Sequence, residues 1–233
     1  MGITILHHLG LGDQLVMNGL VRHLNECGNH VTIIAKRLNK PTVEFMYRDT
    51  DKVTVKYVDT TSAREMWQAA GDGEKLALAT YGMDDNTWNM LSQNFNWTHV
   101  PYLQAKVNPM YMYTKFRVER DREREDELYN RLINGEYIFV HDAGSENNKG
   151  VSLNTDLPII KPDMSVDNIF DYLKIIENAK EVHCINSSFA VMVELVGVAK
   201  NKRFFHTSVA HTYYKPEIVK TVFTEWTFLE STN

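Results

Sequence analysis

The stretch GITILHHLGLGDQLVMNGLVRHLNECGNHVTIIA, residues 2–35, contains the signals of a strand, a glycine turn, a helix and a second strand. The apolar start is the first strand, and Leu-Gly-Leu-Gly is the turn. A helix is predicted over residues 14–26, where apolar residues recur at helical spacing. Asp13 is predicted to cap it, because a carboxylate accepts from the free amides of a first turn. Residues 30–35 are rich in β-branched side chains and form the second strand. This order predicts a βαβ unit with a parallel sheet.

The same alternation of strand and helix signals continues along the rest of the chain. Further strands are predicted at residues 53–58, 75–80, 137–141, 157–161, 181–185 and 202–206. Further helices are predicted at residues 41–47, 62–68, 87–95 and 117–134. A helix capped by Ser165 is predicted to include Ile176, and another is predicted to follow the turn at residues 186–188 and to reach about residue 196. The alternation predicts an α/β protein with two Rossmann-like halves, each with a parallel sheet. We place an N-terminal domain at residues 1–115, a charged connecting helix at 116–135 and a C-terminal domain at 136–233.

Composition excludes several classes of protein. Apolar residues make up 43% of the chain, charged residues 24%, and the formal charge is −5. Nucleic-acid binding proteins usually show a basic face, so we expect no nucleic-acid partner. Cys27 and Cys184 are the two cysteines and make no disulfide framework. No apolar run is as long as a membrane span, and the start of the chain lacks signal-peptide features. We therefore expect a cytoplasmic protein.

The first candidate site is the run from His7 and His8 through Gly12 to Asp13. Glycines at a strand-to-helix turn allow a ligand to approach the backbone, and a helix N-terminus favours negative charge. A dinucleotide fingerprint needs a third glycine where Leu15 stands, and no P-loop lysine follows. Asp13 is either a helix cap or a catalytic carboxylate, and the spacing alone leaves both open.

The second candidate site is Asn186-Ser187-Ser188, between a predicted strand and a predicted helix. Hydroxyl groups in the first turn of a helix join the free amides in holding a phosphate. The carboxyl ends of parallel strands are also where open α/β sheets bind ligands. Ser187 alone would satisfy a simple cap, so the doubled serine after an asparagine favours a phosphate site.

A third group follows the strand predicted at residues 137–141. His141 and Asp142 stand at the carboxyl end of that strand, and Lys149 in the next loop has the charge to neutralise a diphosphate. An ordinary polar surface loop is an equally good interpretation of this group.

No metal site is predicted from the sequence. His-Glu-x-x-His is absent, and the Asp-x-Asp of Asp49-Thr50-Asp51 lies between a predicted helix and a predicted strand, away from the carboxyl end of a strand. His206 and His211 are five residues apart, which differs from the i, i+4 spacing of a helical metal site.

Two of these motifs together resemble a known pattern. Gly10-x-Gly12-Asp13-Gln-Leu resembles the Gly-Asp-x-Leu motif that opens heptosyltransferase-like enzymes of the GT-B superfamily of glycosyltransferases. The segment from Ile176 through Asn186-Ser187-Ser188 to Gly197 resembles their late motif, in which an Asp-Ser-Gly turn precedes a helix that binds the donor's phosphates. Residues 45–49 and 116–121 also resemble segments of short glycosyltransferase-like proteins of bacteria and large DNA viruses.

The resemblance implies two Rossmann-like domains facing across a cleft, the first for the acceptor and the second for a nucleotide sugar. It also implies that Asp13 is the general base. This chain departs from the family in having Asn-Ser-Ser for Asp-Ser-Gly and in being shorter than a usual GT-B enzyme.

The expected activity is that of a metal-independent hexosyl- or deoxyhexosyltransferase in glycan biosynthesis. It would move a sugar from a nucleotide-sugar substrate, with no cofactor, to a glycan or other hydroxyl acceptor by direct displacement. Asp13 would be the base, with His7 and His8 orienting the acceptor or sharing that role. Gly12 and the polar residues of the second half would contact the donor. A nucleotide-sugar epimerase and a non-catalytic nucleotide- or sugar-binding module are the alternatives, since a fold alone does not separate them.

Overall fold

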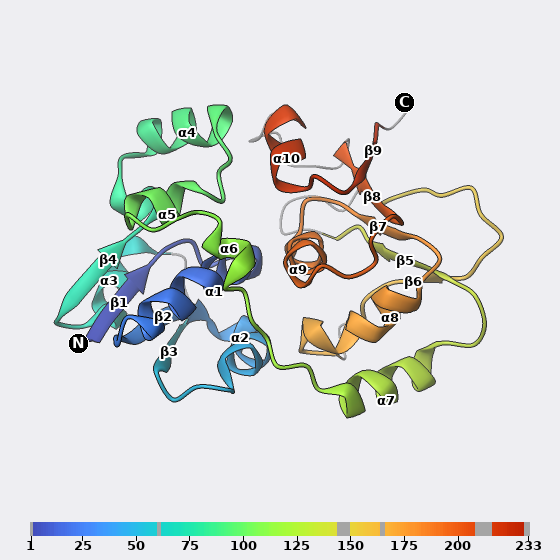
Figure 1. Ribbon diagram of the computed structural model, residues 1–233, viewed down its shortest axis with the longest axis horizontal. Helices are drawn as coiled ribbons and strands as arrows, with labels where there is room; N and C mark the ends of the chain where they lie inside the picture. Colours follow the sequence, from blue (N-terminus) through green and yellow to red (C-terminus); the bar gives the residue numbers. More distant parts are fainter. Residues whose placement is uncertain (1, 60–61, 144–149, 164–165, 208–215, 231–233) are drawn as a thin grey trace. The chain divides into compact units, whose positions relative to one another are not determined.

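The computed structural model describes residues 2–59, 62–143, 150–163, 166–207 and 216–230. The chain divides into two compact units, Met1–Glu119 and Arg120–Asn233. Each unit has one parallel β-sheet with helices packed against it (Figure 1). The predicted α/β class with two parallel sheets is confirmed.

The sheet of the first unit has four parallel strands in the order β3-β2-β1-β4. These are β1 (Gly2–Leu6), β2 (His30–Lys36), β3 (Val53–Val58) and β4 (Glu74–Ala77). Ile3 of β1 is paired with Val31 of β2, as expected for the βαβ unit of the opening stretch. The fourth strand ends before the predicted residue 80, because Ala79 has a left-handed φ of 55° and begins a 3-10 helix.

The helices of the first unit are α1 (Leu11–Glu26), η1 (Arg37–Asn39), α2 (Lys40–Tyr47), α3 (Ala63–Ala70), η2 (Ala79–Gly82), α4 (Asp85–Asn94), α5 (Val100–Gln104) and α6 (Tyr111–Thr114). The last two lie within residues 97–116, where neither a helix nor a strand is predicted from the sequence. Both are single short turns of helix among aromatic residues, so helical periodicity has too few residues to show itself.

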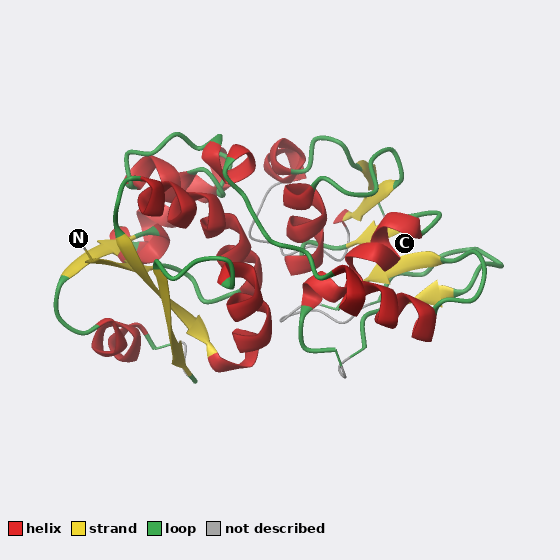
Figure 2. Cartoon of the chain, turned by 60° about the horizontal axis from the view of Figure 1, so that its bottom comes forward, coloured by secondary structure: helices red, strands yellow, loops and turns green. Residues whose placement is uncertain are grey.

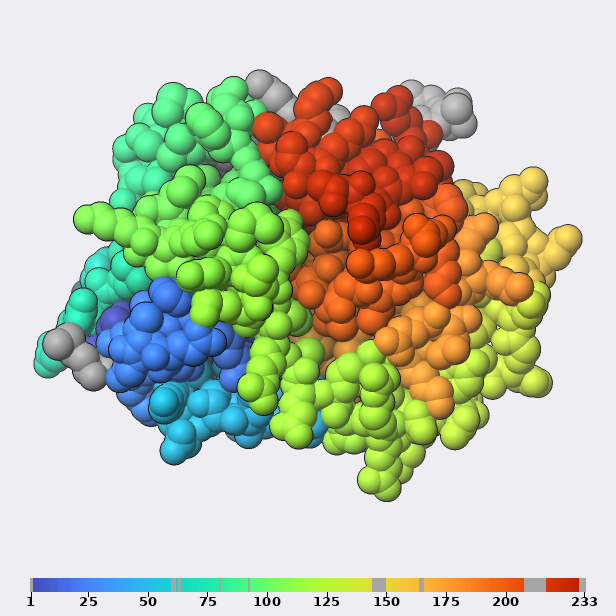
Figure 3. All heavy atoms as spheres, in the orientation of Figure 1, coloured from blue at the N-terminus to red at the C-terminus, as the bar shows by residue number. Residues whose placement is uncertain are grey.

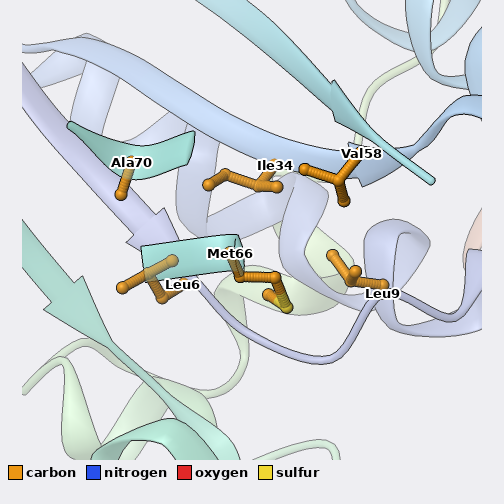
Figure 4. Close-up of a cluster of buried hydrophobic side chains, with 6 residues drawn as sticks. All are labelled: Leu6, Leu9, Ile34, Val58, Met66 and Ala70. Carbon is orange, nitrogen blue, oxygen red and sulfur yellow. The ribbon is translucent and has the colours of Figure 1, made fainter. Parts of the chain in front are cut away.

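A cluster of buried apolar side chains lies between the strands and α3. It consists of Leu6, Leu9, Ile34, Val58, Met66 and Ala70 (Figure 4). Leu9 comes from the glycine turn after β1 and is 5% exposed. The turn that leads to Asp13 is therefore anchored in the core by its own leucine.

Helix α1 is held closely by the segment that contains α5 and α6. A Cβ atom on Gly19 would lie 2.1 Å from the carbonyl oxygen of Tyr111, so the two backbones touch at this point. The Tyr102 hydroxyl donates to the Val16 carbonyl at 2.7 Å and accepts from the Leu20 amide at 3.1 Å. These contacts fix the helix that carries Asp13.

The sheet of the second unit has five parallel strands in the order β6-β5-β7-β8-β9. Figure 2 shows the strands and helices of the chain in separate colours. These are β5 (Ile138–His141), β6 (Ile159–Ile160), β7 (Val182–Cys184), β8 (Arg203–His206) and β9 (Thr227–Leu229). Helical elements of this unit are α7 (Arg122–Leu132), η3 (Ile169–Tyr172), α8 (Leu173–Asn178), α9 (Ser188–Val196) and α10 (Pro216–Val222). β9 and α10 are not predicted from the sequence. Asn168 caps η3 and accepts from the Phe170 amide, whereas the predicted cap Ser165 lies outside the described residues.

The charged segment predicted as a helix over residues 117–134 is helical over Arg122–Leu132, with Asp121 as its N-cap. This helix, α7, packs against η3 and α8 of the second unit through ion pairs. Arg124 pairs with Asp171 at 2.6 Å, and Lys174 pairs with Asp126 at 2.7 Å. Most of its other side chains are exposed and stand on the surface (Figure 3). None of the helices in the described ranges is long and apolar enough to cross a membrane.

Candidate functional site

The glycine turn after β1 places Asp13 in the first turn of α1. The helix begins at Leu11 with Gly10 as its N-cap, and no side chain caps it. The prediction that Asp13 is the cap is therefore wrong. Gly10 has an extended backbone, and its carbonyl already accepts from the Gln14 amide at 3.1 Å, so the helix starts three residues earlier. Gly12 is the second helical residue and is partly exposed.

The structure brings the three predicted catalytic residues, His7, His8 and Asp13, to one small pocket in the first unit. Its remaining lining residues are Val16, Met17, Ala79, Trp88, Trp97 and Pro101. The pocket volume is about 10 Å³, which is room for one water molecule or one hydroxyl group. A whole sugar ring would have to bind at the mouth and present a single hydroxyl to the interior.

Two polar residues of this pocket, Asp13 and His7, have shifted pKa values. Burial raises the pKa of Asp13, while His8 and Lys36 act in the opposite direction. Burial, helped by the neighbouring His8, lowers the pKa of His7 to about 3, so its imidazole is neutral at pH 7. His7 is 2% exposed, and neither ring nitrogen has a hydrogen bond of normal geometry to a described residue. A buried neutral imidazole that lines a pocket is suited to a hydroxyl-bearing ligand.

His8 is the more open of the two histidines. Its side chain is partly exposed and lies beside two aromatic rings, with centroids 6.1 Å from Tyr81 and 5.5 Å from Trp88. His7 is thus buried, whereas His8 is partly exposed. The aromatic walls were missed by sequence reasoning, because Tyr81 and Trp88 reach this site from η2 and α4, which follow the site motif by some 70 residues of chain.

In the second unit, the Asn186-Ser187-Ser188 turn joins β7 to α9. Ser187 is the N-cap of α9, and its hydroxyl accepts from the Ala190 amide at 3.4 Å. The same hydroxyl is hydrogen-bonded to Nδ1 of His141 at 2.9 Å. All three residues of the turn are partly exposed. The predicted residues His141 and Ser187 are thus brought into direct contact.

His141 is the last residue of β5 and stacks on Phe189, with ring centroids 4.4 Å apart. Burial lowers its pKa to about 4, so the imidazole is neutral at pH 7. The side chain is fixed on one face by Phe189 and at one nitrogen by Ser187. It therefore holds the N-terminus of α9 against the end of the neighbouring strand.

Asp142 is 8% exposed and already engaged. One carboxylate oxygen accepts from the Lys161 ammonium at 2.6 Å and from the Val151 amide at 2.9 Å. Burial opposes ionisation, but Lys161 and the amide outweigh it and hold the pKa of Asp142 below its usual range. The predicted cation, Lys149, lies outside the described residues. Lys161, directly after β6, was missed, although a lysine at a strand's carboxyl end is a signal visible in the sequence.

Comparison with known proteins gives likeness of structure only. No protein-family model matches the chain, and no curated protein matches it significantly. The crystal structure of a glycosyl transferase of family 9 from Veillonella parvula is similar over all of this chain and 87% of its own, with a TM-score of 0.58 and 10% identity.

Two structures of the E. coli heptosyltransferase WaaC are also similar, one with ADP-2-deoxy-2-fluoro heptose and one with ADP. Their TM-scores are 0.43 and 0.44 at 9% and 10% identity, and each match covers all of this chain and 94% of that one. At such identities the likeness is one of fold. The chain has the α/β fold of the family 9 glycosyl transferase from Veillonella parvula, which is the GT-B-like fold expected from its motifs.

Proposed function

We propose that this protein is a metal-independent glycosyltransferase that moves a hexosyl or deoxyhexosyl group from a nucleotide sugar to a hydroxyl group of a glycan or other acceptor. The observation that carries the proposal is the pocket in which Asp13 lies beside His7 and His8 at a strand-to-helix turn. The shared fold with a glycosyltransferase over the full chain supports it. The fold alone would fit other chemistries, so the pocket is the deciding feature.

Asp13 has the environment of a general base. Burial raises the pKa of its carboxyl group, which makes the carboxylate a stronger proton acceptor than an exposed one. In the proposed reaction the acceptor oxygen attacks the anomeric carbon and its proton passes to Asp13. The bond between the anomeric carbon and the phosphate oxygen breaks, and the nucleoside diphosphate leaves with the bonding electrons. His7, which is neutral, and His8 would orient the acceptor hydroxyl.

The leaving diphosphate would bind the second unit at the N-terminus of α9. The free amides of a nine-residue helix and its positive dipole end favour an anion there. The Ser187 hydroxyl is committed to its cap and to His141, so it shapes the site, while the partly exposed Ser188 offers its hydroxyl to the ligand. Lys161, and Lys149 as expected from the sequence, would supply positive charge.

Changing Ser187 and Ser188 together to alanine is expected to weaken nucleoside diphosphate binding by about 1–3 kcal/mol, the scale of lost hydrogen bonds to a charged group. Titration calorimetry measures this. Loss of the Ser187 cap alone should lower the free energy of unfolding by about 1 kcal/mol, so a thermal melt must confirm that the double variant is folded. Single Ser188→Ala separates the ligand contact from the cap. Equal affinity in the folded double variant would place the diphosphate elsewhere.

Sugar transfer is expected to continue at the same rate in excess EDTA. The reason is that the proposed leaving-group stabilisation comes from helix amides, a hydroxyl and lysines rather than from a bound cation. The rate should be measured before and after EDTA and again after adding Mn²⁺ or Mg²⁺. An inactive EDTA-treated enzyme that either cation restores would refute metal independence.

A further inference from the structure

Three side chains of the second unit form a hydrogen-bonded line that the proposed mechanism does not use. Oε2 of Glu181 lies 2.8 Å from Nε2 of His183, and Nδ1 of His183 lies 2.9 Å from Nε2 of His206. The two imidazoles are 3% and 7% exposed, whereas the glutamate side chain is about half exposed. His183 also stacks on Phe204, at 4.7 Å between centroids and 11° between planes, which fixes the plane of its ring.

The register of β7 and β8 makes this line continuous. His183 is paired with Phe204, and His206 stands two residues further along β8 on the same face of the sheet. Glu181 directly precedes β7, so it lies at the amino end of the strand. The line therefore runs from the amino end of β7 to the carboxyl end of β8.

The positions of the protons along the line follow from its first member. A carboxylate only accepts hydrogen bonds, so Nε2 of His183 must carry its proton towards Glu181. Burial lowers the pKa of His183 despite the glutamate, so the ring is neutral at pH 7 and Nδ1 bears a lone pair. That lone pair requires a donor, and the donor is Nε2–H of His206.

The bond to His183 uses Nε2 of His206, which leaves Nδ1 as the other nitrogen of the ring to be assigned. Burial, with a contribution from His183, lowers the pKa of His206 to about 4, while the Asp142 carboxylate acts in the opposite direction. His206 is therefore neutral with its proton on Nε2, and its Nδ1 is a hydrogen-bond acceptor. No described residue donates to this nitrogen.

The location of His206 indicates what this acceptor is for. It is the last residue of β8, next to β7, whose carboxyl end leads into Asn186-Ser187-Ser188. Asp142, at the end of β5, acts on it electrostatically and is itself an acceptor. An ionised diphosphate carries only acceptors and would be repelled by a lone pair beside a carboxylate. Hydroxyl groups, which donate, fit both.

We propose that His206 Nδ1 accepts a hydrogen bond from a hydroxyl group of the nucleotide-sugar donor, with Glu181 and His183 as positioning residues that fix its tautomer. This assignment rests on the proposed function. The hydroxyl belongs either to the ribose or to the transferred sugar, and binding measurements separate the two sources.

Two substitutions of His206 separate its two nitrogens. In His206→Gln the amide nitrogen occupies the place of Nε2 and still donates to His183, but the acceptor at Nδ1 is lost. In His206→Asn the amide oxygen occupies the place of Nδ1, and the bond to His183 is lost instead. A purely structural role predicts that the glutamine variant behaves as wild type and that the asparagine variant does not.

The binding experiment uses the full chain and calorimetry with ADP, GDP and UDP, their sugar derivatives, their 2′,3′-dideoxy analogues and inorganic pyrophosphate. We expect His206→Gln to weaken binding of the preferred nucleotide or nucleotide sugar by about 3- to 10-fold, the scale of one neutral hydrogen bond, with pyrophosphate affinity unchanged. If the ribose is the source, wild type will bind the dideoxy analogue more weakly than the parent nucleotide, whereas the glutamine variant will bind the two with equal affinity. If the sugar is the source, only binding of the nucleotide sugar will weaken.

The failures are distinguishable. Unchanged affinity of His206→Gln for nucleotides and nucleotide sugars that wild type binds would overturn this assignment and leave the proposed function standing. Absence of nucleotide binding to wild type would overturn both.

A further readout is the tautomer of each histidine, which long-range ¹H–¹⁵N NMR reports directly. Nε2–H is expected on both histidines and should persist in Glu181→Gln but lose its bias in Glu181→Ala. A proton on Nδ1 of His206 in wild type would overturn the assignment.

Discussion

Replacing Asp13 with asparagine is expected to slow sugar transfer by about 10²–10⁴-fold, the usual contribution of a general base. The amide has nearly the same shape but cannot take up the acceptor's proton. Asp13 makes no capping hydrogen bond at the N-cap of α1, so the fold should tolerate the change. Because burial raises the pKa of Asp13, its ionised form opposes folding at neutral pH, so the uncharged amide should not lower the free energy of unfolding. The measurements are kcat at saturating donor and acceptor, and a thermal melt.

Asp85→Asn is the matched control for this substitution. It makes the same change in the first turn of α4 at an exposed position, and we expect an unaltered rate. Nucleotide affinity should also be unaltered in Asp13→Asn, because the diphosphate is proposed to bind the other unit. A near-normal rate in a folded Asp13→Asn protein would refute the base assignment, and His7 and His8 would be the next candidates.

Replacing Gly10 with alanine is expected to lower kcat by about 10²-fold, although residue 10 would touch no substrate in this mechanism. A Cβ atom at this position would lie 2.5 Å from Oδ2 of Asp13, about 1 Å short of ordinary van der Waals contact. The backbone of Gly10 is in an extended conformation that alanine adopts without strain, so the carboxylate will move rather than the turn. A shift of this size is enough to misalign a base with the hydroxyl it must deprotonate.

Gly2→Ala provides the control, because a Cβ atom there meets nothing within 4 Å. It should leave both kcat and the melting temperature as in wild type. Gly10→Ala should lower kcat while lowering the free energy of unfolding by at most about 1 kcal/mol, the scale of a poorer N-cap residue. Full activity of a folded Gly10→Ala protein would show that the carboxylate position seen here does not govern the rate.

The parallel βαβ architecture was predictable because its signals are local. In residues 2–35 the two strands, the glycine turn and the helix are all contained in one continuous stretch. The start of α1 was misplaced for an equally local reason: aspartate is a better cap than glycine in general, but Gly10 is held extended by the turn. β9 was missed because three residues carry no alternation to detect.

The candidate sites were only partly predictable, because their partners depend on which strands become neighbours. The sequence placed His141 and Ser187 at strand ends, and the adjacency of β5 and β7 brings them to 2.9 Å. The bond between His183 and His206 likewise needs β7 beside β8. The order of strands in a sheet is set by packing of the whole unit, and no spacing in the sequence specifies it.

Release of nucleoside diphosphate from a nucleotide sugar, matched one-to-one by glycoside formed on an added acceptor, tests the proposed transferase activity most directly. The assay should take ADP-, GDP-, UDP- and dTDP-hexoses and deoxyhexoses with an array of glycan acceptors. We predict that wild type yields both products in equal amounts with at least one donor and that Asp13→Asn does so far more slowly. Conversion of the donor to an isomeric nucleotide sugar, or tight binding of a donor with neither product formed, would contradict the proposal.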